Sequence, residues 1–274
     1  MSTVDVYRIT DQLDDLTLDA LIARLEARGK HPHFIAMMHE YLEAIPIDSA
    51  RSVLDLGCGT GVVARAIADR KTFTGRITGI DRSSYLIDAA AKFAEQEGLG
   101  STVAFIAGDS HSLNLPSAAF DAVVAHTLLS HVEDPAVVLK EIARLLKPGG
   151  KVGIFDGDFA SFTYGIDDDP AKAKAVAEAI VQAVATNPTV MREMPKLLRA
   201  SGLALEAAFS HVVADIGKAD FFAPGLQSFV TVLPKSGAMT AREARDWVDM
   251  MMKQSDEGVY FGSANFYSYV ATRR

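Results

Sequence analysis

The sequence predicts an α/β protein built on a parallel, doubly wound sheet. Short apolar runs with strand character alternate with longer segments whose apolar residues recur every three or four positions, as they do in helices. Parallel strands need helical crossovers of this length, and right-handed crossovers place helices on both faces of the sheet. The chain has 274 residues and is 49% hydrophobic, which is enough to fill one large core.

Five runs in the first part of the chain are predicted as strands. They are rich in β-branched and aromatic residues and lie between turn-forming residues. The spacing leaves room for a helix or a loop between each strand and the next. In chain order the predicted strands are 52–56, 76–81, 102–107, 120–126 and 151–156.

Two helices between these strands have clear apolar stripes. One stripe runs from Leu86 to Ala94. The other follows Asp134-Pro135, a favourable pair for the N-cap and the first helical position, and is predicted to end at the Lys-Pro-Gly-Gly segment 147–150. The stripe residues are Leu86, Ala89, Ala90, Phe93 and Ala94 in the first helix, and Val138, Ile142, Leu145 and Leu146 in the second.

The segments that flank these strands are predicted to be largely helical. Residues 1–50 contain two helical patterns, and the second begins at Pro32. After residue 156 we expect a loop to residue 169, followed by helices, one of which opens with the capping box of Thr240 and Glu243. Two further strands are predicted, at 205–213 and 265–273.

This pattern divides the chain into three parts. We expect residues 1–50 to form an N-terminal helical cap and residues 51–157 to form the ligand-binding core. Residues 158–274 would complete the sheet, with a helical insert near 215–262 that forms part of the substrate cap. In a sheet of this kind the ligand belongs at the carboxyl ends of the strands, beside the first strand.

The composition excludes several classes of partner. The net charge of −8 and the isoelectric point of about 5.4 argue against binding to nucleic acid. Affinity for nucleic-acid phosphates depends on clustered Lys and Arg residues, and no such cluster is evident in the sequence. No apolar stretch reaches the roughly 18 residues that span a bilayer, and the chain begins with polar and acidic residues. The lone Cys58 and the lack of metal-ligand spacings predict neither a disulfide nor a metal site. We therefore expect a cytoplasmic protein that binds neither nucleic acid nor membrane.

The segment RSVLDLGCGTGVVARA, residues 51–66, carries the main functional signal. Gly59, Gly61 and Ala64 satisfy the G-x-G-x-x-G/A spacing of dinucleotide-binding turns. Asp81 lies 22 residues after Gly59, where a ligand of the ribose is expected, although it could instead cap the helix that begins near Tyr85. The spacing alone leaves an NAD-dependent oxidoreductase open.

Asp55 favours a different ligand for this turn. A carboxylate just before the turn opposes a pyrophosphate that would bind at the helix N-terminus. A sulfonium cofactor with an α-ammonium group suits the same site, because Asp55 attracts the ammonium and the glycines allow close approach. Asp81 can then accept hydrogen bonds from both ribose hydroxyls.

Residues 55–61, Asp-Leu-Gly-Cys-Gly-Thr-Gly, resemble the first motif of the class I S-adenosylmethionine-dependent methyltransferases. Later segments agree in order and spacing: Asp81 ends the second strand, Gly108-Asp109 follows the third, Pro116 precedes FDAVVAHTLLSHVEDP, and LLKPGGKVGIFD builds the fifth. The resemblance covers about residues 50–157. It implies a seven-stranded Rossmann-like sheet of order 3-2-1-4-5-7-6 whose last strand is antiparallel.

The resemblance also implies the cofactor S-adenosyl-L-methionine and a set of residues that bind it. Gly57 and Gly59 would lie against the methionine moiety, and the backbone at His126 would help to bind the ammonium group. Asp109 and the Ser110 amide would contact the adenine, and Arg82 would flank it where family members commonly carry a hydrophobic residue. The implied cofactor-binding residues are Asp55, Gly57, Gly59, Gly61, Asp81, Arg82, Asp109, Ser110 and His126.

Methyl transfer from sulfur is an in-line displacement in which the protein mainly aligns the reactants and excludes water. A base is needed only when the acceptor must lose a proton, and His131, after the fourth strand, is the candidate. A histidine in this segment is also common in the family whatever the substrate. The sequence therefore predicts a methyltransferase acting on a small-molecule acceptor and releasing S-adenosyl-L-homocysteine. The alternatives are an NAD-dependent oxidoreductase and a non-catalytic S-adenosylmethionine-binding protein.

Overall fold

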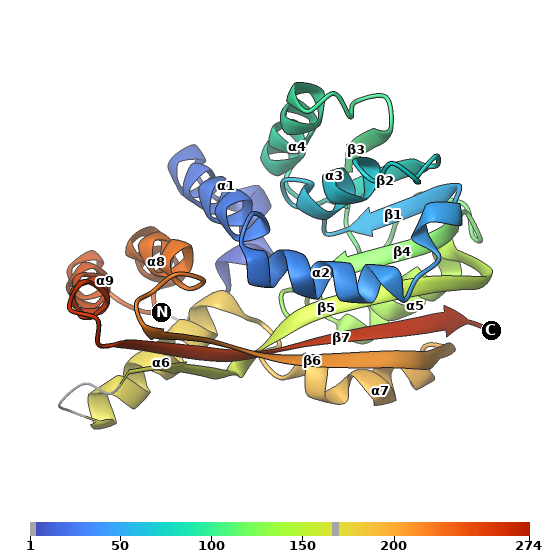
Figure 1. Ribbon diagram of the computed structural model, residues 1–274. Coiled ribbons are helices and arrows are strands. Elements are labelled where there is room, and N and C mark those ends of the chain that lie inside the picture. The colour runs from blue at the N-terminus through green and yellow to red at the C-terminus, as the bar shows by residue number, and fades with distance from the viewer. Residues whose placement is uncertain (1–3, 166–169) are drawn as a thin grey trace.

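A seven-stranded sheet forms the centre of the computed structural model, which describes residues 4–165 and 170–274 (Figure 1). The strand order is β3-β2-β1-β4-β5-β7-β6. The first five strands pair in parallel, and β7 is antiparallel to both of its neighbours, which confirms the predicted sheet. The strands are β1 (Ser52–Leu56), β2 (Arg76–Asp81), β3 (Val103–Ala107), β4 (Phe120–His126), β5 (Leu146–Tyr164), β6 (Leu203–Gly217) and β7 (Tyr260–Arg273).

Helices begin and end where the local sequence favours it. Asp134 caps α5 by accepting hydrogen bonds from two backbone amides, and α5 ends at Leu145, before the Lys-Pro-Gly-Gly segment. The predicted capping box of Thr240 and Glu243 opens α9. The helices are η1 (Val6–Gln12), α1 (Asp15–Gly29), α2 (Pro32–Glu43), η2 (Ile47–Ser49), α3 (Val62–Ala68), α4 (Ser84–Gln96), α5 (Pro135–Leu145), α6 (Pro170–Val184), α7 (Val190–Ala200), α8 (Ala223–Ser236) and α9 (Ala241–Asp256).

Both faces of the central strands β1 and β4 are buried. Successive residues of β1 belong to different parts of the core: Val53 packs in the cluster that includes α1 and α2, whereas Leu54 packs in the cluster that includes α5 and α7. Figure 1 shows α2 along one side of the sheet and α7 on the other. A parallel strand covered on both sides needs apolar residues at nearly every position, which explains the continuous apolar runs in the sequence.

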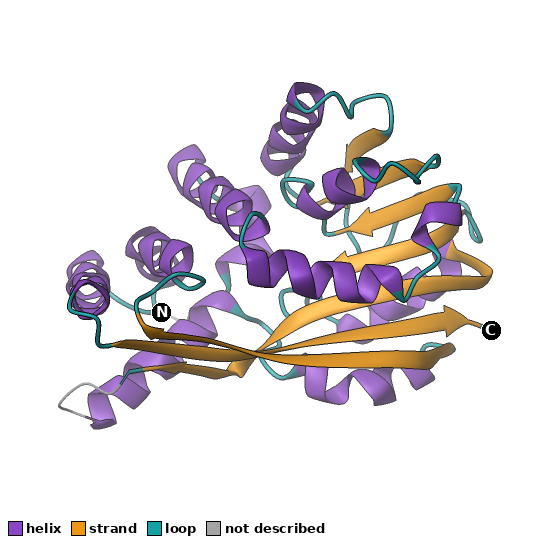
Figure 2. Cartoon of the chain, viewed as in Figure 1, coloured by secondary structure: helices purple, strands orange, loops and turns teal. Residues whose placement is uncertain are grey.

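The three C-terminal strands extend well beyond the parallel part of the sheet, toward α8 and α9 (Figure 2). The loop predicted from residue 156 is therefore wrong as far as Tyr164, because these residues continue β5 and pair with β7. The pairing shifts register between Asp158 and Thr163, and this irregularity breaks the alternating pattern that marks a strand in the sequence. The rest of the predicted loop, residues 166–169, lies outside the described residues.

The two helices of residues 1–50 have different positions. The helix α2 packs on the sheet, where Tyr41 contacts Phe155 of β5, and it contributes Phe34 to the cleft described below. The segments η1 and α1 also border this cleft. None of the helices in residues 4–165 and 170–274 is both long and apolar enough to cross a bilayer.

Candidate active site

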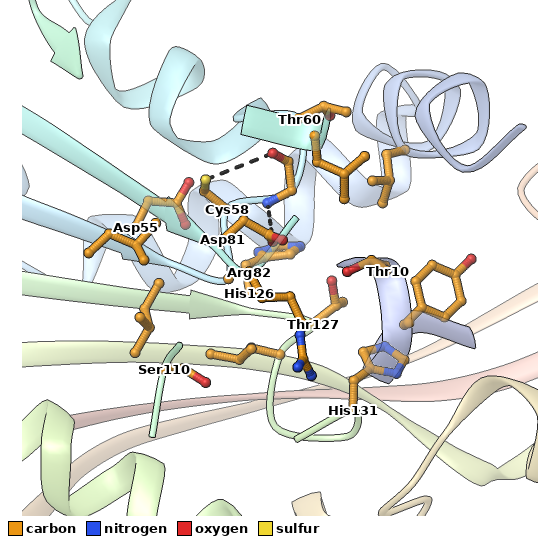
Figure 3. A pocket seen from close by; sticks show the side chains of 18 of the residues that line it. Thr10, Asp55, Cys58, Thr60, Asp81, Arg82, Ser110, His126, Thr127 and His131 are labelled. Carbon is orange, nitrogen blue, oxygen red and sulfur yellow. Dashed lines mark hydrogen bonds between the residues drawn. The ribbon is translucent and has the colours of Figure 1, made fainter. Parts of the chain in front are cut away.

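A cleft opens where β1, β2 and β4 end. Its walls are the glycine turn after β1, the loops after β2, β3 and β4, and the segments η1 and α1. Figure 3 shows Asp55 and Asp81 among the strand-end side chains, with Thr10 and His131 also at the cleft. Nine of the ten residues predicted from the sequence line it: Asp55, Gly57, Gly59, Asp81, Arg82, Asp109, Ser110, His126 and His131.

The glycine turn depends on backbone conformations that other residues rarely adopt. Gly57 and Gly59 have φ angles of +72° and +53°, and a Cβ atom on Gly57 would lie 2.6 Å from the Leu128 side chain. Gly61 is different, because it is not among the residues that line the cleft. It caps α3 with φ at +76° and packs against Phe105, so its place in the turn is structural.

Asp55 presents a buried oxygen with no partner to the cleft. Its side chain lies at the end of β1 and is only 1% exposed. Oδ2 accepts a hydrogen bond of 3.0 Å from the Ala64 amide in the first turn of α3, whereas Oδ1 has no partner among the described residues. Burial is the main cause that raises the pKa of Asp55 to about 7. The hydrogen bond from the Ala64 amide lowers this pKa, and the negative charge of Asp81 raises it. A cation beside Oδ1 would satisfy the oxygen and favour the ionised carboxylate.

Asp81 is held rigidly at the end of β2. Its two oxygens accept hydrogen bonds from the amides of Gly59, at 2.9 Å, and Ser83, at 3.0 Å. The N-cap of α4 is Ser83, whose hydroxyl accepts from the Leu86 amide, so Asp81 is not the N-cap of that helix. Each oxygen of an ionised carboxylate has a second acceptor position, which leaves Asp81 able to bind two hydroxyl groups.

Arg82 and Asp109 both have protein partners at the rim of the cleft. The Arg82 guanidinium donates to the Arg8 carbonyl and forms an ion pair with Asp11, 3.1 Å from Nε to Oδ1. It therefore ties η1 to the loop after β2. Asp109 accepts from the backbone amide of His111 at 2.9 Å and lies 2.7 Å from its ring Nδ1. The side chain of Asp109 is otherwise exposed, so its second oxygen is accessible.

The His126 side chain is buried in the core, and the residue also lines the cleft. The ring lies 2.8 Å from the Tyr41 hydroxyl and stacks on Phe155 with centroids 4.3 Å apart. Burial, followed by the charge of Arg28, lowers the pKa of His126 well below its usual value, so the ring is neutral. The next residue, Thr127, has φ at +53°, an uncommon conformation that turns the backbone sharply where β4 ends.

His131 is paired with a carboxylate that the sequence analysis missed. Its Nδ1 lies 3.1 Å from Oδ2 of Asp5, whose side chain is 2% exposed and also accepts hydrogen bonds from the amide and hydroxyl of Thr186. Because a carboxylate only accepts, Nδ1 carries the proton of a neutral His131 and Nε2 is left as the acceptor. This is the arrangement of an oriented general base.

Two arginines of α1 were also missed. Arg24 donates to the hydroxyls of Tyr7 and Ser228, and Arg28 donates to Oγ1 of Thr127 at 3.1 Å. They lie four residues apart and therefore on one face of the helix. An arginine spacing of this kind is usual on exposed helices, so only the fold identifies these two as inward-facing.

A second cavity continues from the cleft, and we call it the aromatic chamber. The two cavities share Arg24, Arg28, Thr127 and Phe159. The Trp247 side chain is not among the lining residues; it packs against Tyr164 and Phe229 as part of the core. The aromatic residues that line the chamber are Phe159, Phe162, Tyr164, Phe221, Phe222, Phe229 and Phe266.

Parts of this chain are similar to known proteins. Residues 54–154 match a family model described as a methyltransferase domain. A sterol 24-C-methyltransferase of Aspergillus fumigatus is 37% identical over 131 residues, which cover 48% of this chain and 33% of that protein. An uncharacterized 37.1 kDa protein in a transposon of Streptomyces fradiae is 28% identical over 256 residues, covering 93% of this chain and 70% of that protein.

Solved structures show how widely this fold is shared. The crystal structure of the cyclase SpnF has a TM-score of 0.66 and 20% sequence identity, and covers 99% of this chain and 98% of its own. At this level of identity the likeness establishes the fold alone. The chain spans only about a third of the length of the sterol methyltransferase.

Proposed function

We propose that this chain is a class I S-adenosylmethionine-dependent methyltransferase, which the methyltransferase-domain match of residues 54–154 supports, and that it transfers the methyl group of S-adenosyl-L-methionine to a small-molecule acceptor. The observation that carries the proposal is the unpartnered Oδ1 of Asp55 at the carboxyl end of β1. A buried carboxylate oxygen without a partner is costly, and a bound cation removes that cost. The cofactor offers such a cation in its α-ammonium group.

The cleft matches both charges at the amino-acid end of this cofactor. Asp55 is an acid, and Arg28 lines the same cleft with its guanidinium bonded only to Thr127 among the described residues. We assign the ammonium group to Asp55 and the cofactor carboxylate to Arg28. Asp81 would hold the ribose hydroxyls, and the exposed oxygen of Asp109 would accept from the adenine amino group.

The geometry of Asp55 argues against the dinucleotide alternative. In dinucleotide-binding turns, the amides at the start of the helix bind the pyrophosphate. Here the Asp55 carboxylate already accepts from the Ala64 amide in the first turn of α3. A phosphate at this position would compete with that hydrogen bond and face a second acid, Asp81. The glycine spacing that left NAD open is therefore better explained by a cationic ligand.

The residues around the cleft suit methyl transfer by alignment. When bound, S-adenosyl-L-methionine supplies an electrophilic methyl group, and the protein needs to position an acceptor in line with it and exclude water. The segments η1 and α1 cover this region, and the Arg82 contacts hold η1 in place. For a hydroxyl acceptor, Nε2 of His131 would take the proton while Asp5 fixes the ring orientation.

A turnover screen tests the proposal. The protein is incubated with S-adenosyl-L-methionine and a panel of phenols, amines, carboxylic acids and thiols, and S-adenosyl-L-homocysteine is measured by mass spectrometry. We expect release that depends on one acceptor class, and no binding of NAD by calorimetry. Tight binding of S-adenosyl-L-homocysteine without turnover on any class would favour the non-catalytic alternative, and saturable NAD binding alone would favour an oxidoreductase.

A further inference from the structure

The two arginines of α1 differ from Arg65 and Arg70 by what they contact. Arg65 pairs with Glu26 and Glu97, and Arg70 pairs with Glu43 and Asp48. Over residues 4–165 and 170–274, no carboxylate forms an ion pair with Arg24 or Arg28, whose hydrogen-bond partners are neutral hydroxyls. Two cations that form no ion pair among the described residues therefore lie where the cleft meets the aromatic chamber.

Arg24 and Arg28 lie close enough for their positive charges to repel each other, so a bound anion would stabilise both. Burial and the neighbouring Arg24 charge lower the pKa of Arg28 to about 10, so Arg28 is still cationic at neutral pH. Its Nε is buried and has no partner among the described residues. A half-buried guanidinium loses part of its hydration, and this free-energy cost is offset only by a nearby anion or by hydrogen bonds. The single carboxylate of the cofactor can form an ion pair with one of the two arginines, and the other arginine then still lacks an anionic partner.

Both arginines line both cavities, and Arg24 is the one that lies against an aromatic ring of the chamber, while it also contacts Tyr7 at the cleft. Its guanidinium carbon lies 5.6 Å from the centre of the Phe229 ring, which lines the chamber, and its Nη1 reaches Ser228 of α8. Arg28 lies instead near the end of β4, over Phe34 and bonded to Thr127. The two guanidinium groups thus suit two anionic ligands. Arg28 suits a ligand in the cleft, and Arg24 suits a ligand in the aromatic chamber.

The chamber itself supplies an apolar environment and no acid. Seven aromatic side chains line it, and burial raises the pKa of Tyr164, the one phenol among them, so that group is neutral. We propose that the methyl acceptor is an amphipathic acid, whose apolar body occupies the aromatic chamber and whose carboxylate or phosphate binds Arg24. This inference rests on the proposed methyltransferase function, which it narrows to one class of acceptor.

Matched probes test the charge requirement directly. We would measure binding of 4-phenylbutyrate, its uncharged amide, and phenethyl phosphate by ligand-detected NMR, with and without saturating S-adenosyl-L-homocysteine. We expect the wild-type protein to bind at least one of the two anions about tenfold more tightly than the amide, the range for a charge-assisted hydrogen bond. The tighter of the two anions identifies the chemistry that Arg24 recognises.

Three variants separate a charge effect from a folding effect. Arg24→Gln should bring the anions and the amide to within about twofold, and Arg24→Lys should keep a preference for the anion because it keeps the charge. The control is Arg199→Gln, at an exposed arginine of α7, which should behave as wild type. The affinity for S-adenosyl-L-homocysteine should change less than threefold in all of them, which also shows that each variant is folded.

The outcomes distinguish the proposal of an acidic acceptor from the proposal of methyltransferase function. Equal binding of anions and amide, no detectable binding of any probe, or a preference that survives in Arg24→Gln would overturn the acceptor assignment, even if the protein methylates an acceptor. If instead S-adenosyl-L-homocysteine fails to bind but the anion preference depends on Arg24, the anion site stands and the methyltransferase proposal fails.

Discussion

Replacing Asp55 with asparagine should stabilise the unliganded protein at alkaline pH while weakening its proposed function. The pKa of this group is raised from 3.8 to about 7 by burial. A pKa that is higher in the folded state means that stability falls as pH rises through the interval between the two values. At 1.36 kcal/mol per pKa unit, the ionised Asp55 costs the unliganded fold about 4 kcal/mol above pH 7.

The asparagine variant recovers only part of this free energy. Its side-chain oxygen can still accept from the Ala64 amide, but its NH2 group replaces the unpartnered Oδ1, and a buried unsatisfied donor costs about 1–3 kcal/mol. We therefore expect a net gain of about 1–3 kcal/mol in the free energy of unfolding at pH 8. The advantage should shrink as the pH falls from 7 toward 4.5 and disappear or reverse there.

Urea unfolding of both proteins at pH 4.5, 6 and 8 measures this difference. Asp88→Asn, at an exposed position of α4, is the matched control and should show no such pH-dependent difference from wild type. A difference between Asp55→Asn and wild type that stays constant across these pH values would refute the reasoning. It would mean that Asp55 is ionised in the folded protein at no cost, and so has no need of a bound cation.

Three further substitutions have expected outcomes. Asp81→Ala should weaken S-adenosyl-L-homocysteine binding by about 1.5–3 kcal/mol with the fold retained, and an unchanged dissociation constant in calorimetry would limit Asp81 to holding the glycine turn. His131→Ala should lower turnover of a hydroxyl acceptor by about 10²- to 10⁴-fold with little change in cofactor affinity. Asp5→Asn should slow the same reaction, because its amide no longer selects the productive tautomer of His131; an unaltered kcat would exclude the pair from catalysis.

The parallel part of the fold could be predicted because its signals are local. Each strand contains a short apolar run, and Asp134 and Thr240 mark helix starts through contacts within a few residues. The methyltransferase resemblance, carried by four motifs in one segment, is confirmed by the family match over residues 54–154. The extension of β5 was missed because its bulge removes the alternation that identifies a strand.

The contacts of the site depend on segments that are distant in sequence. His131 meets Asp5 across 126 residues, and Arg24 reaches Ser228 across 204 residues. No spacing rule covers such pairs, so the sequence could name His131 but not its partner. Arg82 was expected beside the adenine, yet its contacts to Arg8 and Asp11 depend on where η1 lies. The cytoplasmic location stays a prediction.

The central claim, that Asp55 faces the ammonium group of the cofactor, is tested most directly by comparing two ligands. S-adenosyl-L-homocysteine carries the amino-acid moiety, and 5′-methylthioadenosine lacks it while keeping the adenine, ribose and sulfur. Calorimetry should show that Asp55→Asn weakens S-adenosyl-L-homocysteine binding by about tenfold or more, the range for hydrogen bonds to a charged group, and changes 5′-methylthioadenosine binding less than twofold. An equal loss for both ligands, or no loss for either, would contradict the account.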